Sequence, residues 1–303
     1  MSGTVLAPGS KRGAAAMELA AIKGRSLWED AARRLMRNRA AVISMGLLAA
    51  LLLAAIVGPY LTPYSYDQIN KDDVWAEPLV HGHLLGADSL GRDLLARLLI
   101  GLRVSLAIGV VATAVSLVIG VAWGATAGYL GGRIDELMMR FVDVLYALPF
   151  IFFVILLMVV FGRNFILMFL AIGAVEWLTM SRIVRGQTVT LKQKEFIEAA
   201  RAAGLSPAAI IARHIIPNLM GPVVIYVTLT IPAVIMAESF LSFLGMGVQE
   251  PLTSLGTLIS VGAQDRDLAP WLLIFPSVVM VVTLMSFNFI GDGLRDAIDP
   301  KDR

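Results

Sequence analysis

Six long apolar runs constrain the fold of this chain more than any other feature of its sequence. A helix needs about 20 consecutive apolar residues to cross the hydrocarbon core of a bilayer. The runs are continuous and do not alternate with polar residues, which favours helices over a transmembrane β-barrel. We therefore predict an all-α membrane protein with six transmembrane helices, at 40–61, 104–130, 144–162, 164–181, 219–237 and 268–291.

The composition supports this assignment. The chain is 57% hydrophobic and only 16% charged, whereas about a quarter of the residues in a soluble domain are charged. It contains no Cys, which excludes disulfides, thiolate metal sites and a catalytic thiol. The first apolar run lies behind residues 1–39 and is longer than the apolar core of a signal peptide, which has about 7–15 residues. We expect a retained anchor.

The distribution of Lys and Arg predicts the orientation. If six helices cross the membrane, nineteen of these residues fall on one side: eight in 1–39, two in 131–143, six in 182–218 and three in 292–303. The other side holds six. Because positively charged loops stay in the cytoplasm, both termini and the loop 182–218 are expected to be cytoplasmic.

The chain divides into a tail, a first helix, an exterior segment and a five-helix domain. In the tail, Ser26 and Glu29 form a capping box, which predicts a short amphipathic helix, with a solvated basic lead-in as the alternative. In the exterior segment, Arg92, Arg97 and Arg103 recur at near-helical spacing, which predicts an amphipathic helix at the outer face of the membrane. The expected boundaries are 1–39 for the tail, 40–61 for the first helix, 62–103 for the exterior segment, 104–291 for the five-helix domain and 292–303 for the cytoplasmic C-terminal tail.

Four glycines recur every four residues along the second run: Gly120, Gly124, Gly128 and Gly132. Small residues at this spacing let another helix approach closely within the membrane. The pattern favours a tight helix contact, within the subunit or with a second one, over a general enrichment of glycine in membrane helices.

The loop between the fourth and fifth runs has the turn chemistry of a helical hairpin. Residues 194–203 are good helix formers, and Gly204 can adopt a left-handed conformation after them. Ser206 is then an N-cap and Pro207 the first residue of a second helix, over 208–216, which Pro217 would end or kink. Its apolar side carries Phe196, Ile197, Ala200 and Leu205, and its polar side carries Glu198, Arg201 and Arg213. The apolar side packs either against a partner or against the protein's own bundle.

The sequence motifs for phosphate binding, metal binding and proton transfer are incomplete. Gly86 and Gly91 have the spacing of a phosphate-binding loop, but the Lys and the Ser or Thr that bind phosphate and magnesium do not follow them. His81 and His83 form a possible metal pair without a third ligand nearby. Glu176 and Glu238 are acids within or at the edge of apolar runs, where such residues are candidates for function. A proton relay would need more of them, so we favour interior or boundary roles.

Four segments, in order, resemble the dipeptide, oligopeptide and nickel family of ABC importer permeases. Glu198–Gly204 (EAARAAG), followed by Ile215–Pro217, resembles the EAA loop of these permeases. The other three are His83–Asp93 (HLLGADSLGRD), Phe240–Gly245 (FLSFLG) and Phe287–Pro300 (FNFIGDGLRDAIDP). The resemblance covers residues 26–303. Within the family, Gly24–Asp30, Phe152–Leu157, Arg182–Gln187 and Asp299–Arg303 are most similar to the C subunit of oligopeptide permeases.

The resemblance implies a type I ABC importer permease fold in the bacterial cytoplasmic (inner) membrane. It implies that loop 182–218 forms coupling helices that enter a cleft of the ATPase subunit, with Glu198, Ala199, Ala200, Gly204, Ser206 and Pro207 as the coupling residues. The implied protein partners are a homologous permease, with which this chain would form a heterodimer, two ABC ATPase subunits that carry ATP and magnesium, and an extracytoplasmic peptide-binding protein. The chain would also contact the lipid bilayer, and it would bind no nucleic acid. The chain itself would be no enzyme and would hold no cofactor.

Oligopeptides are the implied substrates, with dipeptides, glutathione and nickel complexes as alternatives. The competing class is an ion-coupled secondary transporter. Such a protein would need paired intramembrane acids, broken helices and an inverted repeat, whereas Glu176 stands alone and no repeat is evident.

Overall fold

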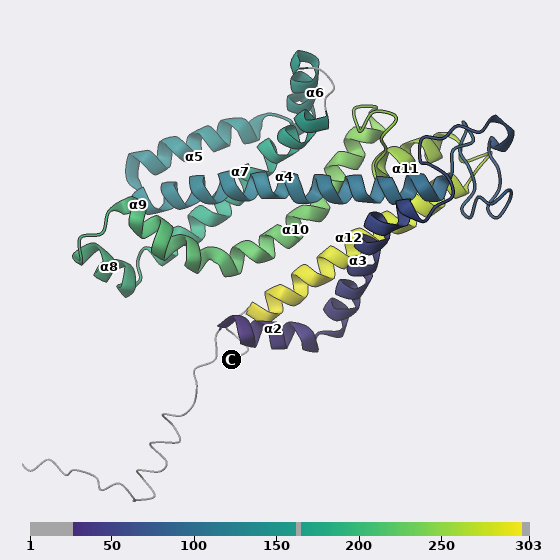
Figure 1. The fold of residues 1–303 in the computed structure, drawn as a ribbon. Helices are drawn as coiled ribbons and strands as arrows, with labels where there is room; N and C mark the ends of the chain where they lie inside the picture. Colours follow the sequence, from purple (N-terminus) through teal and green to yellow (C-terminus); the bar gives the residue numbers. More distant parts are fainter. Residues whose placement is uncertain (1–26, 162–164, 299–303) are drawn as a thin grey trace, which may run out of the picture.

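The computed structural model describes residues 27–161 and 165–298, and within these ranges the regular structure is helical (Figure 1). This agrees with the all-α prediction. The N-terminal residues 1–26, and with them the Ser26 cap, lie outside the described ranges. The helices are α2 (Leu27–Arg37), α3 (Arg39–Val57), η1 (Gly58–Tyr60), η2 (Lys71–Asp73), α4 (Leu94–Leu130), α5 (Gly132–Ala147), α6 (Phe150–Phe161), α7 (Phe165–Leu191), α8 (Glu195–Ala202), α9 (Pro207–Ile210), η3 (Ile211–Ile215), α10 (Ile216–Phe243), α11 (Leu255–Gln264) and α12 (Trp271–Ile298).

Four of the described helical stretches are long and apolar enough to cross a membrane: Arg39–Tyr60, Leu94–Leu130, Pro207–Phe243 and Trp271–Ile298. The count of six stays a prediction. Two of these stretches have 37 residues, which at 1.5 Å per residue gives about 55 Å, against a hydrocarbon core of about 30 Å. They are therefore long enough to extend beyond the bilayer.

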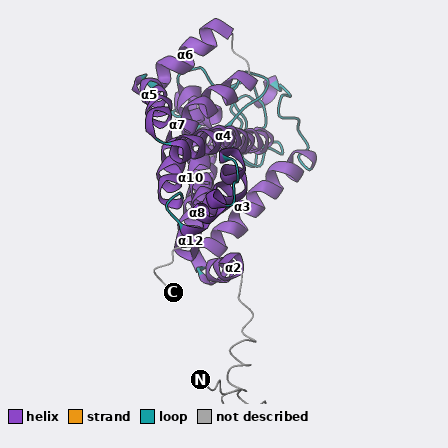
Figure 2. Ribbon diagram, turned by 90° about the vertical axis from the view of Figure 1, so that its left-hand side faces the viewer, coloured by secondary structure: helices purple, strands orange, loops and turns teal. Residues whose placement is uncertain are grey.

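Helix α4 is the central element of the fold. It packs along α7 and also contacts α5, α10 and α11, and Figure 1 shows it running along the length of the molecule. The 90° view in Figure 2 shows α3 and α2 to one side of this group. Helix α3 packs mainly against α12, and α2 folds back on α12 and α3. The described part of the predicted tail helix is thus held against the bundle.

The helix that contains the second apolar run begins ten residues earlier than its expected start at 104. The Asp93 side chain caps the helix by accepting a hydrogen bond from the Ala96 backbone N–H at 2.7 Å. The predicted helix is therefore present from Leu94 on, but the prediction that it is a separate amphipathic helix at the outer face is wrong. Its residues form the first turns of α4, where Arg97 is 1% exposed.

The expected helix over 144–162 is also wrong in its bounds. Helix α5 ends at Ala147, Leu148 is extended with ψ 127°, and α6 begins at Phe150. Proline disfavours the helical conformation in the residue before it, and Pro149 therefore explains the break. An apolar run alone does not reveal such a break.

The second limb of the hairpin is not a separate helix over 208–216. It is the start of one helical stretch, Pro207–Phe243, that is long and apolar enough to cross a membrane. Residues Ile211–Ile215 form a π turn, and the Ile216 N–H bonds to the Ile211 carbonyl. Pro217 follows in the first turn of α10. A wider turn removes the clash that a proline ring makes with the carbonyl four residues earlier, so Pro217 does not end the helix.

Candidate functional site

The turn of the hairpin (α8, the turn 203–206 and α9) has the geometry that its sequence predicts. Gly204 has φ +79°, its N–H bonds to the Arg201 carbonyl at 2.9 Å, and the Leu205 N–H bonds to the Ala200 carbonyl at 3.2 Å. This pair of bonds is a Schellman motif, which ends a helix on a left-handed residue. The Ser206 hydroxyl then accepts a hydrogen bond from the Ala209 N–H at 3.3 Å, and Pro207 occupies the first turn of α9.

The apolar side of the hairpin packs against its own bundle, which is the second of the two alternatives. Ile197 and Ile210 are fully buried and Ala200 is 6% exposed. They form one apolar cluster with residues of α4 and α7, among them Tyr129 and Val184. A partner is therefore not needed to bury Ile197 and Ala200, whereas Phe196 on the same side stays exposed.

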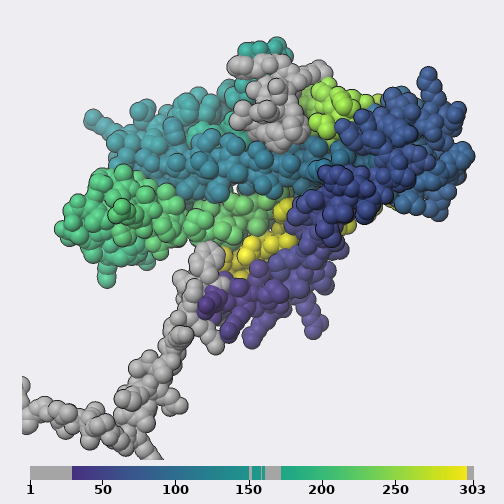
Figure 3. Space-filling view, in the orientation of Figure 1, coloured from purple at the N-terminus to yellow at the C-terminus, as the bar shows by residue number. Residues whose placement is uncertain are grey.

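The surface left for a partner is the outer side of the hairpin. Of the predicted coupling residues, Glu198, Ala199, Gly204, Ser206 and Pro207 are exposed, while Ala200 is buried. Phe196 is 43% exposed beside them. Figure 3 shows this part of the chain, in green, as a rounded knob at one end of the molecule.

The hairpin is tied to the end of α4. The Arg201 guanidinium lies 5.3 Å from the centre of the Tyr129 ring and its Nε donates to the Tyr129 hydroxyl at 3.3 Å. Lys192 Nζ donates to the Gly128 carbonyl at 2.9 Å. Glu198 lines a surface hollow together with Tyr129, Lys192 and Arg201. These contacts connect the exposed turn to α4, a helix long and apolar enough to cross a membrane.

Three of the four repeated glycines form a close helix contact, which we call the glycine seam: Gly120, Gly124 and Gly128. A Cβ atom at Gly120 would lie 2.6 Å from the Met180 side chain, and one at Gly124 would lie 2.4 Å from the Ser181 carbonyl oxygen, both on α7. A Cβ at Gly128 would lie 2.8 Å from the Arg185 carbonyl. Gly132 is not part of this contact: it has φ +57° and open space around its Cβ position.

Ion pairs join α7 to α5 beside the glycine seam. Arg185 donates two hydrogen bonds to the Asp135 carboxylate, at 2.6 and 2.7 Å. Arg182 donates to Asp143 at 2.8 Å, and its guanidinium lies 4.3 Å from the centre of the Tyr146 ring. Sequence reasoning used these arginines for the orientation and for the family resemblance, and it did not predict their ion pairs. No local pattern around Asp135 indicates that its ion-pair partner is Arg185, fifty positions later.

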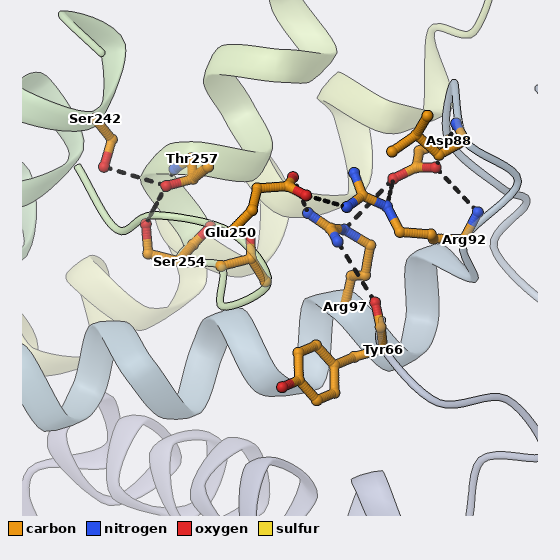
Figure 4. A network of polar contacts seen from close by, with 10 residues as sticks. Tyr66, Asp88, Arg92, Arg97, Ser242, Glu250, Ser254 and Thr257 are labelled. Atoms are coloured by element: carbon orange, nitrogen blue, oxygen red, sulfur yellow. Dashed lines mark hydrogen bonds and ion pairs between the residues drawn. The ribbon is translucent and has the colours of Figure 1, made fainter. Parts of the chain in front are cut away.

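A charged network at the other end of α4 was missed by sequence reasoning (Figure 4). Arg92 bonds to Asp88 at 2.8 Å and to Glu250 at 2.5 Å, and Arg97 reaches the same two acids at 3.5 and 3.4 Å. The hydrogen bond from Arg92 holds the pKa of the Glu250 carboxyl below its ordinary value of 4.5. The network fastens the loop before α11 to the start of α4. The only sequence sign was charge inside the His83–Asp93 segment.

Glu238 lies in a second polar cluster. Its carboxylate is fully buried and accepts hydrogen bonds from the hydroxyls of Ser242 and Ser254, both at 2.6 Å, and of Ser105 at 3.5 Å. Ser105 in turn accepts from the Leu255 N–H at 3.0 Å. The acid thus joins α10 to α4 and to the first turn of α11, in keeping with an interior position.

Glu176 lies elsewhere, at a cavity of about 430 Å³ formed by α5, α6, α7 and α10. The two histidines of the possible metal pair share one acid: His81 lies 2.6 Å and His83 3.3 Å from the Asp73 carboxylate. The hydrogen bond to His81 lowers the pKa of Asp73. Among the residues described, no group of three or more His, Cys, Asp or Glu is arranged to hold a metal ion.

Comparison with known proteins identifies the family. Residues 116–303 match the family described as binding-protein-dependent transport system inner membrane component, and residues 26–78 match the N-terminal TM domain of oligopeptide transport permease C. The chain is 52% identical to an oligopeptide transport system permease protein of Haemophilus influenzae, over 93% of this chain and 91% of the relative. The corresponding protein of Escherichia coli K12 is 54% identical over 93% of this chain and 94% of its own length.

A dipeptide transport system permease protein of Bacillus subtilis is 42% identical, over 92% of this chain and 87% of the relative. The matches cover nearly the whole chain, and the four apolar helical stretches fit a multi-pass inner-membrane protein. This chain belongs to the family of binding-protein-dependent transport system inner membrane components.

Proposed function

We propose that this chain is the transmembrane permease subunit of an ATP-driven importer of oligopeptides. The observation that carries the proposal is the hairpin, whose inner side is fixed to α4 and α7 while Glu198, Gly204 and Pro207 face outward. Two findings support oligopeptides as the substrate class: the chain belongs to a family of transport permeases, and its relatives are named for oligopeptide transport.

The arrangement in the membrane is part of the proposal. Six helices cross the bilayer, both termini lie in the cytoplasm, and the segments α5–α6 and α7 supply the third and fourth crossings. The excess of Lys and Arg in the tail, the hairpin loop and the C-terminal segment supports this orientation. The domain boundaries are those expected from the sequence, with the coupling loop at 182–218, except that α4 begins at Leu94 and not at 104.

ATP hydrolysis takes place on partner subunits in this account. The exposed side of the hairpin enters a cleft on one of the two ATPases, and closure of the ATPases moves the hairpin as a rigid body. Tyr129, Lys192 and the glycine seam pass this movement to α4 and α7, and the bundle rocks between inward-open and outward-open forms. A homologous permease forms the other half of the path, and an extracytoplasmic binding protein delivers the peptide.

Two alternatives remain. The dipeptide permease relative supports the same mechanism with dipeptides, and glutathione or nickel complexes are further substrates of this kind. An ion-coupled secondary transporter is the alternative of another class. Uptake that depends on ATP and continues after the ion gradients are collapsed favours the importer.

Co-purification of the ATPase tests the proposal. The tagged chain is expressed with its candidate partners, and the amount of ATPase recovered with it is measured for the native chain and for Glu198→Lys. Glu136→Lys, the same charge reversal at an exposed acid on α5 outside the hairpin residues, is the matched control. We expect the ATPase with the native chain and the control, and about tenfold less with Glu198→Lys. Equal recovery with all three chains would exclude the hairpin as the docking site.

A further inference from the structure

The cavity at Glu176 has the features of a binding site that coupling to the ATPase does not explain. It lies where α5 breaks into α6, with Tyr146 from α5, Pro149 from the break, Phe153 from α6, Glu176 and Thr179 from α7, and Ala237 from α10 among its lining residues. Its volume of about 430 Å³ falls within the range of about 300–1,000 Å³ for small-molecule sites. The lining is largely apolar, with one acid.

The Glu176 carboxylate makes no hydrogen bond and no ion pair with any residue that the structure describes. The nearby cation, Arg182, is already bound to Asp143 at 2.8 Å and stacks over Tyr146. An acid in an apolar surrounding costs free energy unless it faces water or a cation. Glu238 is different, because its carboxylate accepts hydrogen bonds from three serine hydroxyls.

We propose that the Glu176 cavity binds the cationic group of a peptide during its passage through the membrane. The occupant is an alkylammonium or guanidinium group, which is either the free amino terminus of the peptide or a basic side chain. A cavity lined by a carboxylate and by the Phe153 ring suits such a cation, because the ring face attracts positive charge. A metal ion is a poor fit, since the described residues offer the carboxylate no second acid or histidine in the cavity.

The position on α7 links this site to the coupling hairpin. Helix α7 carries Glu176 near its middle, packs on the glycine seam through Met180 and Ser181, and ends at Leu191, four residues before α8 begins. A movement of the hairpin would therefore displace the carboxylate relative to α5 and α10. This inference rests on the proposed import of peptides, and the first of its two tests is independent of transport.

The first test measures the charge preference of the cavity in the assembled complex. The chain has no Cys, so Thr179→Cys, one helical turn from Glu176 on the same wall, gives the only thiol of this chain, and the partner subunits are used in cysteine-free form. Two methanethiosulfonate reagents are compared, one carrying a trimethylammonium group and one carrying a sulfonate. The rate of each with the introduced thiol is divided by its rate with a free thiol in solution. The measurement is made in the resting and in the ATP-bound complex. We expect the cationic reagent to be preferred by about tenfold, and the preference to disappear when Glu176→Gln is added.

Three results would overturn the inference at this stage. The preference could be absent, it could persist in Glu176→Gln, or the thiol could fail to react in both states. The first result would mean that a cation of the partner permease already neutralises Glu176. The matched control, Glu136→Gln, should leave the preference unchanged because that acid does not line the cavity.

The second test compares import of two tripeptides that differ only in Lys or norleucine at the middle position. If the side chain is the bound cation, Glu176→Gln lowers the ratio of Lys to norleucine import by about tenfold. If the amino terminus is bound, import of both peptides falls together and Glu176→Asp restores it. Unchanged import of both peptides in Glu176→Gln would contradict a role on the path. Loss of import that Glu176→Asp does not restore would also contradict it, because a charge role requires only the carboxylate.

Discussion

At the scale of the single residue, Gly204 has the clearest physical requirement. Its φ of +79° costs any L-residue with a Cβ atom about 1–2 kcal/mol, although no atom would crowd that Cβ. We predict that Gly204→Ala lowers the free energy of unfolding of the hairpin by about this amount. Hydrogen exchange of the α8 amides, in the purified complex, measures it.

The matched control is Gly186→Ala in α7. Gly186 is exposed, helical and has open space at its Cβ position, so alanine there should be neutral or stabilising by up to about 1 kcal/mol. Equal exchange rates in the two variants would mean that the left-handed turn does not limit the stability of the hairpin.

The Arg92–Glu250 contact predicts that the stability of the fold depends on pH. Because the pKa of Glu250 is lower in the folded chain than its ordinary value of 4.5, the ionised acid stabilises the fold at pH above that value. The contribution is lost as the pH falls through the lower, folded pKa. We expect the thermal midpoint of the purified chain to fall below about pH 4.5, and to fall less in Glu250→Gln. Identical pH profiles for both chains would contradict the contact.

At the scale of the element, the glycine seam sets the distance between α4 and α7. Gly124→Ala would place a Cβ 2.4 Å from the Ser181 carbonyl oxygen, which belongs to the backbone and cannot move alone. We predict a loss of about 1–3 kcal/mol in the free energy of unfolding, together with reduced transport. Unfolding in mixed detergent measures the first effect.

Gly46→Ala in α3 is the control for this prediction, because Gly46 lies in a membrane helix with nothing within 4 Å of its Cβ position. It should leave stability within about 0.5 kcal/mol of the native chain. If both alanine variants unfold alike, the close approach of α4 and α7 at Gly124 does not contribute to stability.

The elements also show which structural facts the sequence contains. Local chemistry predicted the Gly204 turn, the Ser206 cap and the spacing of the glycine seam, because each depends on residues within four positions. Hydropathy could not place the break at Leu148, because apolar residues continue through it. It also could not place the start of α4 at Leu94, because the Asp93 cap sets that start. The bonds of Glu250 to Arg92 and Arg97 join residues more than 150 positions apart, and no local pattern indicates them.

At the scale of the whole molecule, the hairpin and the Arg92–Glu250 network lie at opposite ends of α4, as Figure 1 and Figure 4 together show. The proposed orientation places the hairpin in the cytoplasm. We predict that, in intact cells, an impermeant thiol reagent labels Leu79→Cys, a 78% exposed position before α4, and does not label Ala199→Cys. Inverted vesicles should give the opposite pattern. The same pattern in cells and vesicles would refute the orientation.

The central claim is that the hairpin couples ATP hydrolysis on partner subunits to peptide movement through this chain. Its most direct test is the number of peptides imported per ATP hydrolysed, measured in one preparation of proteoliposomes with the full complex. For Gly204→Asp we predict that this ratio falls by about tenfold or more, while the chain remains in the membrane and Gly186→Ala keeps the native ratio. A native ratio in Gly204→Asp, with normal peptide uptake, would contradict the account.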